Sequence, residues 1–283
     1  MHVVYQKEIT RGQDISGVIS KYGWVGHEIV TEEFSNSVGE IDRTLFKTAI
    51  KPEDNIMVFA SIRIANQVQY KKLSKVQSGV IADGDKLKWS SYATYLPNDM
   101  LLNPFGILFP WGYLRDPMTV KTVKKAFGES GVFIRPNSPW KPFAGFDTSW
   151  ENYEHNILSY GQLERIDPGE ICVLFPRKAI DVVEWRFWIV AGKIATFAPY
   201  SRSTMPDCNK SPPADMILAV EKAISLLEGY EDSLVIDMAE TECGAKIIEL
   251  NGLTTSGFYD GMDIAALLSA IPTMFGYPEV LRT

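Results

Sequence analysis

The stretch from Leu234 to Gly257, LVIDMAETECGAKIIELNGLTTSG, constrains this chain most, because it places carboxylates inside apolar segments. Two apolar segments flank a polar link that ends in Gly, a pattern typical of an antiparallel hairpin. Asp237 lies in the first segment, and alternation puts Glu249 and Asn251 on one face of the second. An antiparallel return can bring Asp237 across from them. Two carboxylates and an amide oxygen are ligands that Mg²⁺ prefers, so the hairpin predicts a hard-cation site that leaves positions for phosphate oxygens.

The alternative interpretation is an ordinary hairpin at a sheet edge with a wet polar face, and each of the three residues taken singly fits it better. The trio is harder to explain in this way, because carboxylates inside apolar strands are costly without a cation or hydrogen-bond donors. Without a metal, Asp237 and Glu249 would be neighbouring like charges that strain the fold. We therefore expect the neutral isosteres Asp237→Asn and Glu249→Gln to leave the metal-free protein equally stable or slightly more stable.

Composition excludes several classes of protein. The 283 residues are 46% hydrophobic and 22% charged, which is typical of a soluble globular chain with one large domain or a few small ones. A net charge of −7 argues against a general nucleic-acid binder. No segment reaches the length of a membrane span, and the N-terminus lacks a signal-peptide pattern. Three widely spaced cysteines indicate neither a disulfide framework nor a zinc site, so we expect a reducing cytoplasm.

The first hundred residues predict an α/β region, since strands and helices alternate as they do around a parallel sheet. The expected elements are a helix over 14–22 closed by Gly23, a strand over 27–34, a buried strand over 55–61, a helix over 61–73 and a strand over 78–83. Residues 89–111 are rich in aromatic residues and Pro, and are expected to be loop and crossover.

Residues 131–146, GVFIRPNSPWKPFAGF, predict a strand that ends at a cation and continues into a loop. Arg135 stands at the strand end, Lys141 follows in the loop, and Gly145 lets the backbone come close to whatever the loop covers. Two cations at such a place favour an anionic ligand. A plain surface position for Arg135 is the alternative.

Residues 184–202 predict a second hairpin, with two alternating strands around Gly192. Glu184 and Arg186 share one face of the first strand, and Arg202 follows the second strand. A face that carries arginine suits phosphate. The alternative is an amphipathic edge hairpin with a cross-strand ion pair.

In their order along the chain, these segments resemble the ATP-grasp ligases. That family has an Asp near the end of one strand and Glu-x-Asn on the next, followed by a small-residue turn, which Thr254–Gly257 matches here. It also has a strand that ends in a phosphate-binding cation, usually Lys, so Arg135 resembles the subset that has Arg there. The Glu184-x-Arg186 hairpin resembles the enzymes of this family that join amino acids to a carboxylate.

The resemblance implies an α/β (α+β) protein with the ATP-grasp fold preceded by an N-terminal α/β domain. The expected domains are an N-terminal pre-grasp domain over 1–104, an N-terminal grasp subdomain over 105–178 and a C-terminal subdomain with the metal site over 179–283. The apolar strand over 169–175 matches the hinge strand of the family, which places Leu174 and Phe175 at the adenine.

The resemblance also implies a ligase that uses ATP and Mg²⁺ to join a carboxylate to an amine through an acyl phosphate. The implied roles are metal ligation by Asp237, Glu249 and Asn251, nucleotide binding by Arg135, Lys141, Leu174, Phe175 and Glu184, and stabilisation of the acyl phosphate by Arg186 and Arg202. The substrates implied are small-molecule or peptide carboxylates and amines, with no membrane partner. A homodimer stays open, as does an acceptor pocket lined by Trp residues between 89 and 150.

Two other classes remain open at this point. One is a nucleotide-binding regulatory or scaffold protein that kept the fold without ligase activity. The other is a metal-dependent hydrolase that uses the same acidic trio without nucleotide, although the chain lacks a set of His ligands for such a site.

Overall fold

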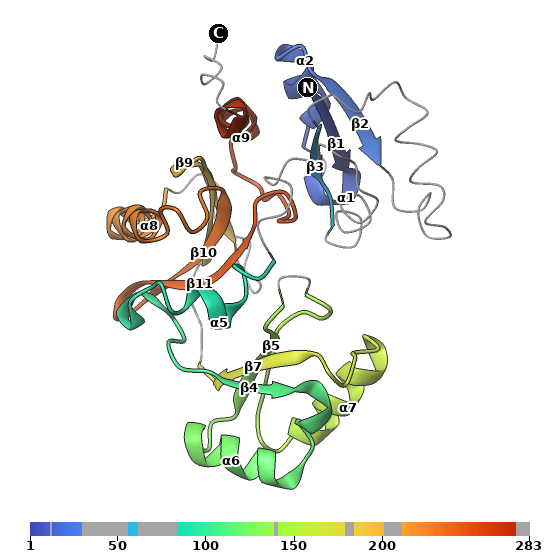
Figure 1. The fold of residues 1–283 in the computed structure, drawn as a ribbon, viewed down its shortest axis with the longest axis vertical. Helices are drawn as coiled ribbons and strands as arrows, with labels where there is room; N and C mark the ends of the chain where they lie inside the picture. Colours follow the sequence, from blue (N-terminus) through green and yellow to red (C-terminus); the bar gives the residue numbers. More distant parts are fainter. Residues whose placement is uncertain are drawn as a thin grey trace. The chain divides into compact units, whose positions relative to one another are not determined.

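A computed structural model describes residues 1–11, 13–29, 56–61, 84–138, 141–178, 184–200 and 211–275. The chain forms two compact units (Figure 1), one from residues 1–83 with 183–283 and one from residues 84–182. The expected division into three domains stays a prediction. In the part of the chain that is described, no helix is long and apolar enough to cross a membrane.

The first unit begins with a parallel three-stranded sheet in the order β2-β1-β3 (Figure 1). Its elements are β1 (His2–Gln6), α1 (Lys7–Thr10), α2 (Ile15–Lys21), β2 (Val25–Ile29) and β3 (Ile56–Phe59). The predicted helix over 14–22 is confirmed: Asp14 caps α2 by accepting a hydrogen bond from the Gly17 N–H at 2.8 Å. The strands predicted near 27 and 55 are confirmed where they are described. The helix over 61–73 and the strand over 78–83 fall outside the described residues.

A four-stranded antiparallel sheet follows in the same unit, in the order β11-β10-β8-β9. Its strands are β8 (Glu184–Val190), β9 (Lys193–Tyr200), β10 (Leu234–Thr241) and β11 (Gly244–Gly252). Both predicted hairpins are therefore confirmed. In the first, Ala191 and Gly192 make a two-residue turn with φ of 47° and 71°, the left-handed values that fit the twist of paired strands.

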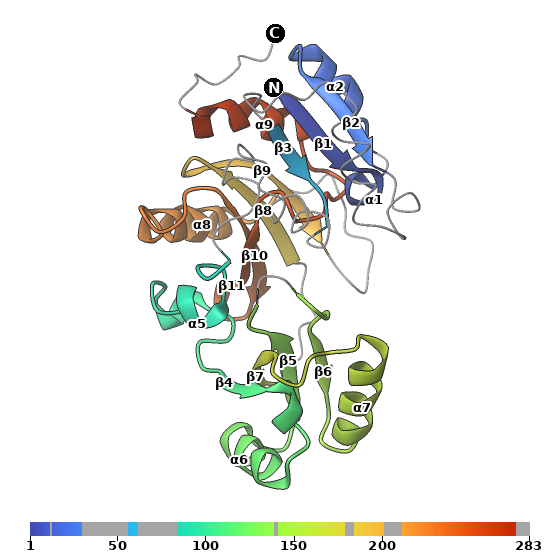
Figure 2. The ribbon, with the colours of Figure 1, turned by 45° about the vertical axis from the view of Figure 1, so that its right-hand side comes forward.

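Two helices pack on opposite faces of this sheet (Figure 2): α8 (Ala214–Leu226) and α9 (Ile264–Ala270), the latter followed by the 3₁₀ helix η5 (Ile271–Phe275). The α9 face carries Trp188 and Val235, and it joins the N-terminal sheet in one hydrophobic core that includes Val3 and Val4. The strands of both sheets are thus held by shared apolar packing, which fixes their polar side chains relative to one another.

The second unit is an antiparallel sheet in the order β4-β7-β5-β6 with helices beside it. Its strands are β4 (Ile107–Pro110), β5 (Val132–Pro136), β6 (Phe146–Thr148) and β7 (Ile171–Pro176). Its helices are α5 (Trp89–Tyr92), η3 (Asn98–Met100), η4 (Trp111–Tyr113), α6 (Pro117–Phe127) and α7 (Tyr153–Leu163). The expectation of plain loop over 89–111 was wrong, because Ile107–Pro110 pairs with β7 as an edge strand.

Burial distinguishes the two described cysteines. Cys172 is completely buried in β7, and burial, followed by the charge of Glu170, raises the pKa of its thiol to about 12. Cys243 is exposed in the hairpin turn. Only the thiolate reacts with alkylating agents. At pH 8 we expect iodoacetamide to modify Cys243 at least about tenfold faster than Cys172 in the native protein, as measured by peptide mass spectrometry. Unfolding in urea should remove the difference, and equal native rates would contradict this environment for Cys172.

Candidate functional site

Three charged side chains form a row across three neighbouring strands. In the register of the sheet, Asp237 of β10 is the direct partner of Glu249 in β11 and of Arg186 in β8. The predicted placement of Asp237 across from Glu249 is therefore confirmed. A β-bulge follows Asp237, so that Met238 pairs with Ile247. Bulges of this kind occur often beside functional sites, where they aim particular side chains.

Arg186 and Asp237 make a two-pronged ion pair. Arg186 Nε donates to Asp237 Oδ1 at 2.7 Å, and Arg186 Nη2 donates to Asp237 Oδ2 at 2.7 Å. Arg186 is 7% exposed and Asp237 is 2% exposed, so neither charge is solvated by bulk water. Burial is the largest effect on the pKa of Arg186 and lowers it, but the charge and hydrogen bonds of Asp237 outweigh burial and raise that pKa. Arg186 thus stays charged.

Asn251 joins the two carboxylates. Its side-chain Nδ2 donates to Asp237 Oδ2 at 2.9 Å and to Glu249 Oε1 at 3.0 Å. One amide group therefore reaches both acids, which places the three oxygen-bearing side chains of the predicted site at a single point of the sheet. Asn251 is buried, whereas Glu249 is only partly buried.

The donor set fits a hard cation. Two carboxylates and an amide converge here, and a carboxylate that accepts hydrogen bonds from arginine keeps further acceptor capacity on each oxygen. Among the described residues no group of three His, Cys, Asp or Glu side chains could hold a metal by itself. A cation at Asp237, Glu249 and Asn251 would therefore need oxygen ligands from a bound substrate as well, which is the arrangement typical of Mg²⁺ with phosphates.

The row of charges corrects one expectation. We expected Asp237 and Glu249 to be uncompensated neighbours in the metal-free protein. Instead, Arg186 neutralises Asp237, and the Asn251 amide donates to both acids. The hypothesis that both neutral isosteres would be harmless therefore no longer holds for Asp237.

Aromatic rings surround the outer end of Arg186. Arg186 Nη1 lies 3.3 Å from the hydroxyl of Tyr259 and donates to it, and the Tyr259 ring centroid is 4.9 Å from Arg186 Cζ. Tyr200 is also near, with its centroid 5.5 Å from Arg186 Cζ. Burial is the main cause that raises the pKa of Tyr259, while Arg186 acts in the opposite direction. Sequence patterns did not single out Tyr200 or Tyr259, because neither stands at a position that a motif marks.

The other residues predicted for this part lie nearby or cannot be described. Glu184 begins β8, is partly exposed, and shares the Arg186 face by alternation. Arg202 falls outside the described residues.

The second unit places Arg135 at the end of β5, where it is 7% exposed. Strand alternation puts Phe133 on the same face, and Phe133 stacks with its cross-strand partner Phe175 at a centroid distance of 6.3 Å. A side chain at Gly145 would come within 2.8 Å of the Phe133 ring and 3.2 Å of Arg135 Cβ, so the predicted close approach at this glycine is confirmed. Lys141 lies in the same loop with a φ of 41°.

Leu174 and Phe175 point to opposite faces of β7. Leu174 belongs to the core beneath the sheet, together with Val132 and Ile134. Phe175 lies on the Arg135 face and contacts Trp89 edge-on, with the ring centroids 5.2 Å apart. Of the two residues assigned to the adenine, only Phe175 has its side chain on the face that carries the cation.

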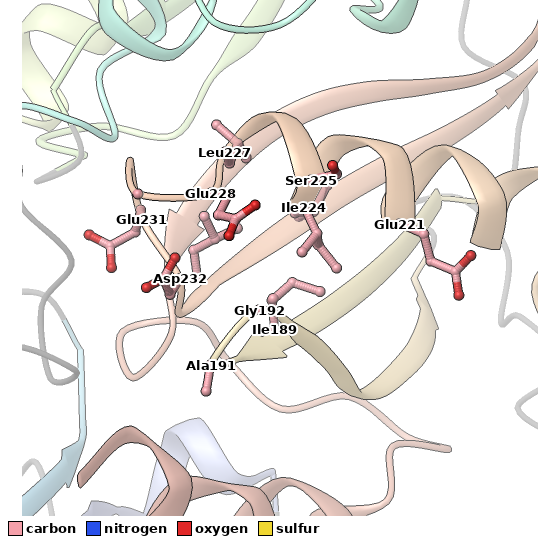
Figure 3. Close-up of a pocket in the computed structure, with 13 residues that line it drawn as sticks. Ile189, Ala191, Gly192, Glu221, Ile224, Ser225, Leu227, Glu228, Glu231 and Asp232 are labelled. Atoms are coloured by element: carbon pink, nitrogen blue, oxygen red, sulfur yellow. The ribbon is translucent and has the colours of Figure 1, made fainter. Parts of the chain in front are cut away.

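A pocket of about 660 Å³ lies between the end of α8 and the sheet (Figure 3). Its apolar floor includes Ile189 and Ile236, and acidic side chains surround it: Glu221, Glu228, Glu231 and Asp232. Ile236 precedes Asp237 in β10, so this pocket is on the face of the sheet opposite the buried ion pair. None of the predicted site residues lines it.

Several solved structures share this fold. A D-alanine–D-alanine ligase from Bacillus anthracis complexed with ATP is 14% identical with a TM-score of 0.56, covering 89% of this chain and 86% of its own. The macrocyclase MdnC from Microcystis aeruginosa MRC, bound with precursor peptide MdnA, is 15% identical with a TM-score of 0.54, covering 95% and 98%. The ATP-grasp ligase PsnB, complexed with minimal precursor, Mg and ADP, is 12% identical with a TM-score of 0.51, covering 94% of each chain.

These likenesses confirm the expected fold, a mixed α/β arrangement with a parallel N-terminal sheet and antiparallel sheets. A comparison with curated proteins gave no match. A family model of the ATP-grasp domain, the third family of its clade, matches residues 22–271, which is most of the chain. The chain therefore belongs to the ATP-grasp superfamily, as a member of that clade family.

Proposed function

We propose that the protein is a ligase that uses ATP and Mg²⁺ to join a carboxylate to an amine through an acyl phosphate. One observation carries this proposal: Asn251 bonds both Asp237 and Glu249 within a sheet whose fold is that of ATP-grasp proteins. Support also comes from the proteins of similar fold, two of which are named as ligases.

In this proposal the side chains work by charge and position. Asp237, Glu249 and Asn251 would hold Mg²⁺, which supplies charge neutralisation for phosphoryl transfer from ATP. Arg186 fixes the orientation of the Asp237 carboxylate through its Nε and Nη2 atoms. Its Nη1 is the guanidinium nitrogen not bound to Asp237, so we assign this end, together with Arg202, to the charge that develops on the carboxylate substrate.

The nucleotide-binding side chains would come from the second unit as well. Arg135 and Lys141 bind phosphate oxygens, since a guanidinium can grip two of them at once. Phe175 offers an apolar ring for the base, and Leu174 can contribute only its backbone because its side chain is in the core. Glu184 at the start of β8 is assigned to the nucleotide too.

The substrates we propose are an amino acid or a peptide on at least one side. MdnC is bound with a precursor peptide, and PsnB is complexed with a minimal precursor. The test is release of phosphate from ATP with Mg²⁺ in the presence of pools of carboxylates and amines, with products identified by mass. A new amide that forms only with nucleotide supports ligation. Unchanged ATP with every pool would favour a nucleotide-binding protein, and turnover without nucleotide would favour a hydrolase.

Arg135 offers a separate test of nucleotide binding. Arg135→Ala should weaken ATP binding by about 1–3 kcal/mol, the usual range for hydrogen bonds to a charged group, and Arg135→Lys should lose less. Calorimetric titration with a non-hydrolysable ATP analogue and Mg²⁺ measures the change. The control is Arg177→Ala, which removes an exposed arginine of the same unit paired with Asp147 at 2.6 Å. An Arg135→Ala protein that binds as tightly as this control would overturn the assignment.

A further inference from the structure

Arg11 lies at the carboxyl edge of the N-terminal parallel sheet. It ends α1, which follows β1 directly, and its backbone has a φ of 49°. The end of β3 is tied to the same edge, because Gln6 Oε1 accepts a hydrogen bond from the Ser61 N–H at 2.8 Å. In open α/β sheets, ligands bind outside the carboxyl ends of the parallel strands. Arg11 therefore occupies the edge of this sheet at which a ligand is expected.

Two hydrogen bonds hold Arg11 against the loop that follows β11. The Phe258 N–H donates to the Ile9 carbonyl at 3.0 Å, and Gln13 Nε2 donates to the Tyr259 carbonyl at 2.8 Å. Arg11 lies between these two attachment points, and its Cζ is 4.3 Å from the centroid of the Tyr259 ring. Its guanidinium is thus placed beside the buried ion pair before any ligand binds, which lowers the entropic cost of recognition.

Arg11 and Arg186 contact the same tyrosine ring but differ in charge balance. Arg186 is buried and neutralised by Asp237. Arg11 is exposed, and its one recorded contact within the described ranges is the Tyr259 ring, with no carboxylate bonded to it. Two cations on one ring repel each other unless an anion joins them. The structure therefore holds a fixed and uncompensated guanidinium next to the proposed site of transfer.

We propose that Arg11 binds the carboxylate of the substrate, an inference that rests on the proposed ligase function. Asp237 and Glu249 would repel a bare carboxylate that approaches the row, so a cation on the approaching side is needed to hold it. The planar fork of a guanidinium matches the two oxygens of a carboxylate. The phosphate-binding role is already assigned to Arg135 and Lys141, which lie in the other unit.

The first test does not depend on turnover and uses acetate as the probe. The Nε–H signal of Arg11 is identified in a ¹H–¹⁵N spectrum at about pH 6 by its loss in Arg11→Asn, since Asn tolerates the left-handed backbone at this position. Sodium acetate should shift this signal in a saturable way. Sodium chloride at the same ionic strength should not. A signal that responds equally to both salts, or to neither, would overturn the proposal.

The second test measures kinetics with a carboxylate that stimulates phosphate release by the wild-type protein. Arg11→Asn should raise the KM for that carboxylate about 10- to 100-fold and leave the KM for ATP within about twofold, and Arg11→Lys should restore part of the loss. An unchanged carboxylate KM would overturn the proposal even if acetate shifts the signal, and an equal rise for ATP would assign Arg11 to phosphate. If no carboxylate stimulates the wild-type protein, the ligase function fails, and the acetate titration alone decides whether Arg11 binds carboxylates.

Discussion

Asp237→Asn should destabilise the metal-free protein by about 3–5 kcal/mol, the range seen when one partner of a buried ion pair is removed. The variant loses the negative charge that Arg186 needs, because both nitrogens of its fork donate to this carboxylate at 2.7 Å. Arg186 itself is 7% exposed, so water cannot replace the lost partner. Its guanidinium would remain charged and buried without compensation.

Glu249→Gln is the matched control, since it also removes one negative charge from the same row. Glu249 is partly exposed, and the amide oxygen of Gln can still accept the hydrogen bond from Asn251. We expect a change within about 1 kcal/mol, as for an exposed charge. Urea unfolding curves of the three proteins in EDTA measure both values. Equal stability of Asp237→Asn and Glu249→Gln would contradict the buried pair, whereas under the proposed function both variants lose turnover of ATP with Mg²⁺.

Gly131→Ala should destabilise the protein by about 3 kcal/mol or more, through overpacking and backbone strain together. Gly131 has a φ of 104°, which side chains other than glycine rarely adopt. A Cβ at this position would lie 2.2 Å from the Thr148 carbonyl oxygen and 2.9 Å from the Ser149 Cα, both of which belong to the backbone. Gly131 directly precedes β5, so relief of the clash would have to displace the strand that carries Arg135.

Gly192→Ala separates these two causes. Gly192 also has a positive φ, 71°, but an added Cβ there would meet no atom within 4 Å. It should cost only the backbone preference, about 1–2 kcal/mol. The comparison is made by urea unfolding of the two variants and the wild type. If both glycine variants lose the same stability, the packing around Gly131 is not as described. A Gly131→Ala protein with weakened ATP binding would connect the strand position to Arg135.

Local patterns in the sequence were sufficient where a site depends on one hairpin. The period of two in a strand put Glu249 and Asn251 on one face, and the short polar link brought Asp237 back across from Glu249. The same reasoning found Arg135 at a strand end and the close approach at Gly145. Each of these inferences needs only residues within about twenty positions of one another, where turn length limits the register.

Contacts between distant segments were beyond those patterns. Arg186 and Asp237 are 51 positions apart, and their pairing is set by the register between β8 and β10, which the sequence of neither hairpin determines. We therefore assigned Arg186 to a reaction intermediate and missed its ion pair. Arg11 and Tyr259 are farther apart still. Their contact depends on how the N-terminal sheet packs through the core shared with α9, and a single arginine or tyrosine in a turn carries no periodic signal.

The shared core of the first unit also dictates an order of events during synthesis. Val3 and Val4 pack in the same cluster as Leu267 and Leu268, whereas the second unit is built from one continuous stretch, residues 84–182. At translation rates of roughly 5–20 residues per second, the strand His2–Gln6 leaves the ribosome on the order of tens of seconds before α9. The second unit can fold within that interval. The N-terminal strands, by contrast, must be kept from aggregating, so this chain is expected to rely on chaperones bound to its N-terminal segment.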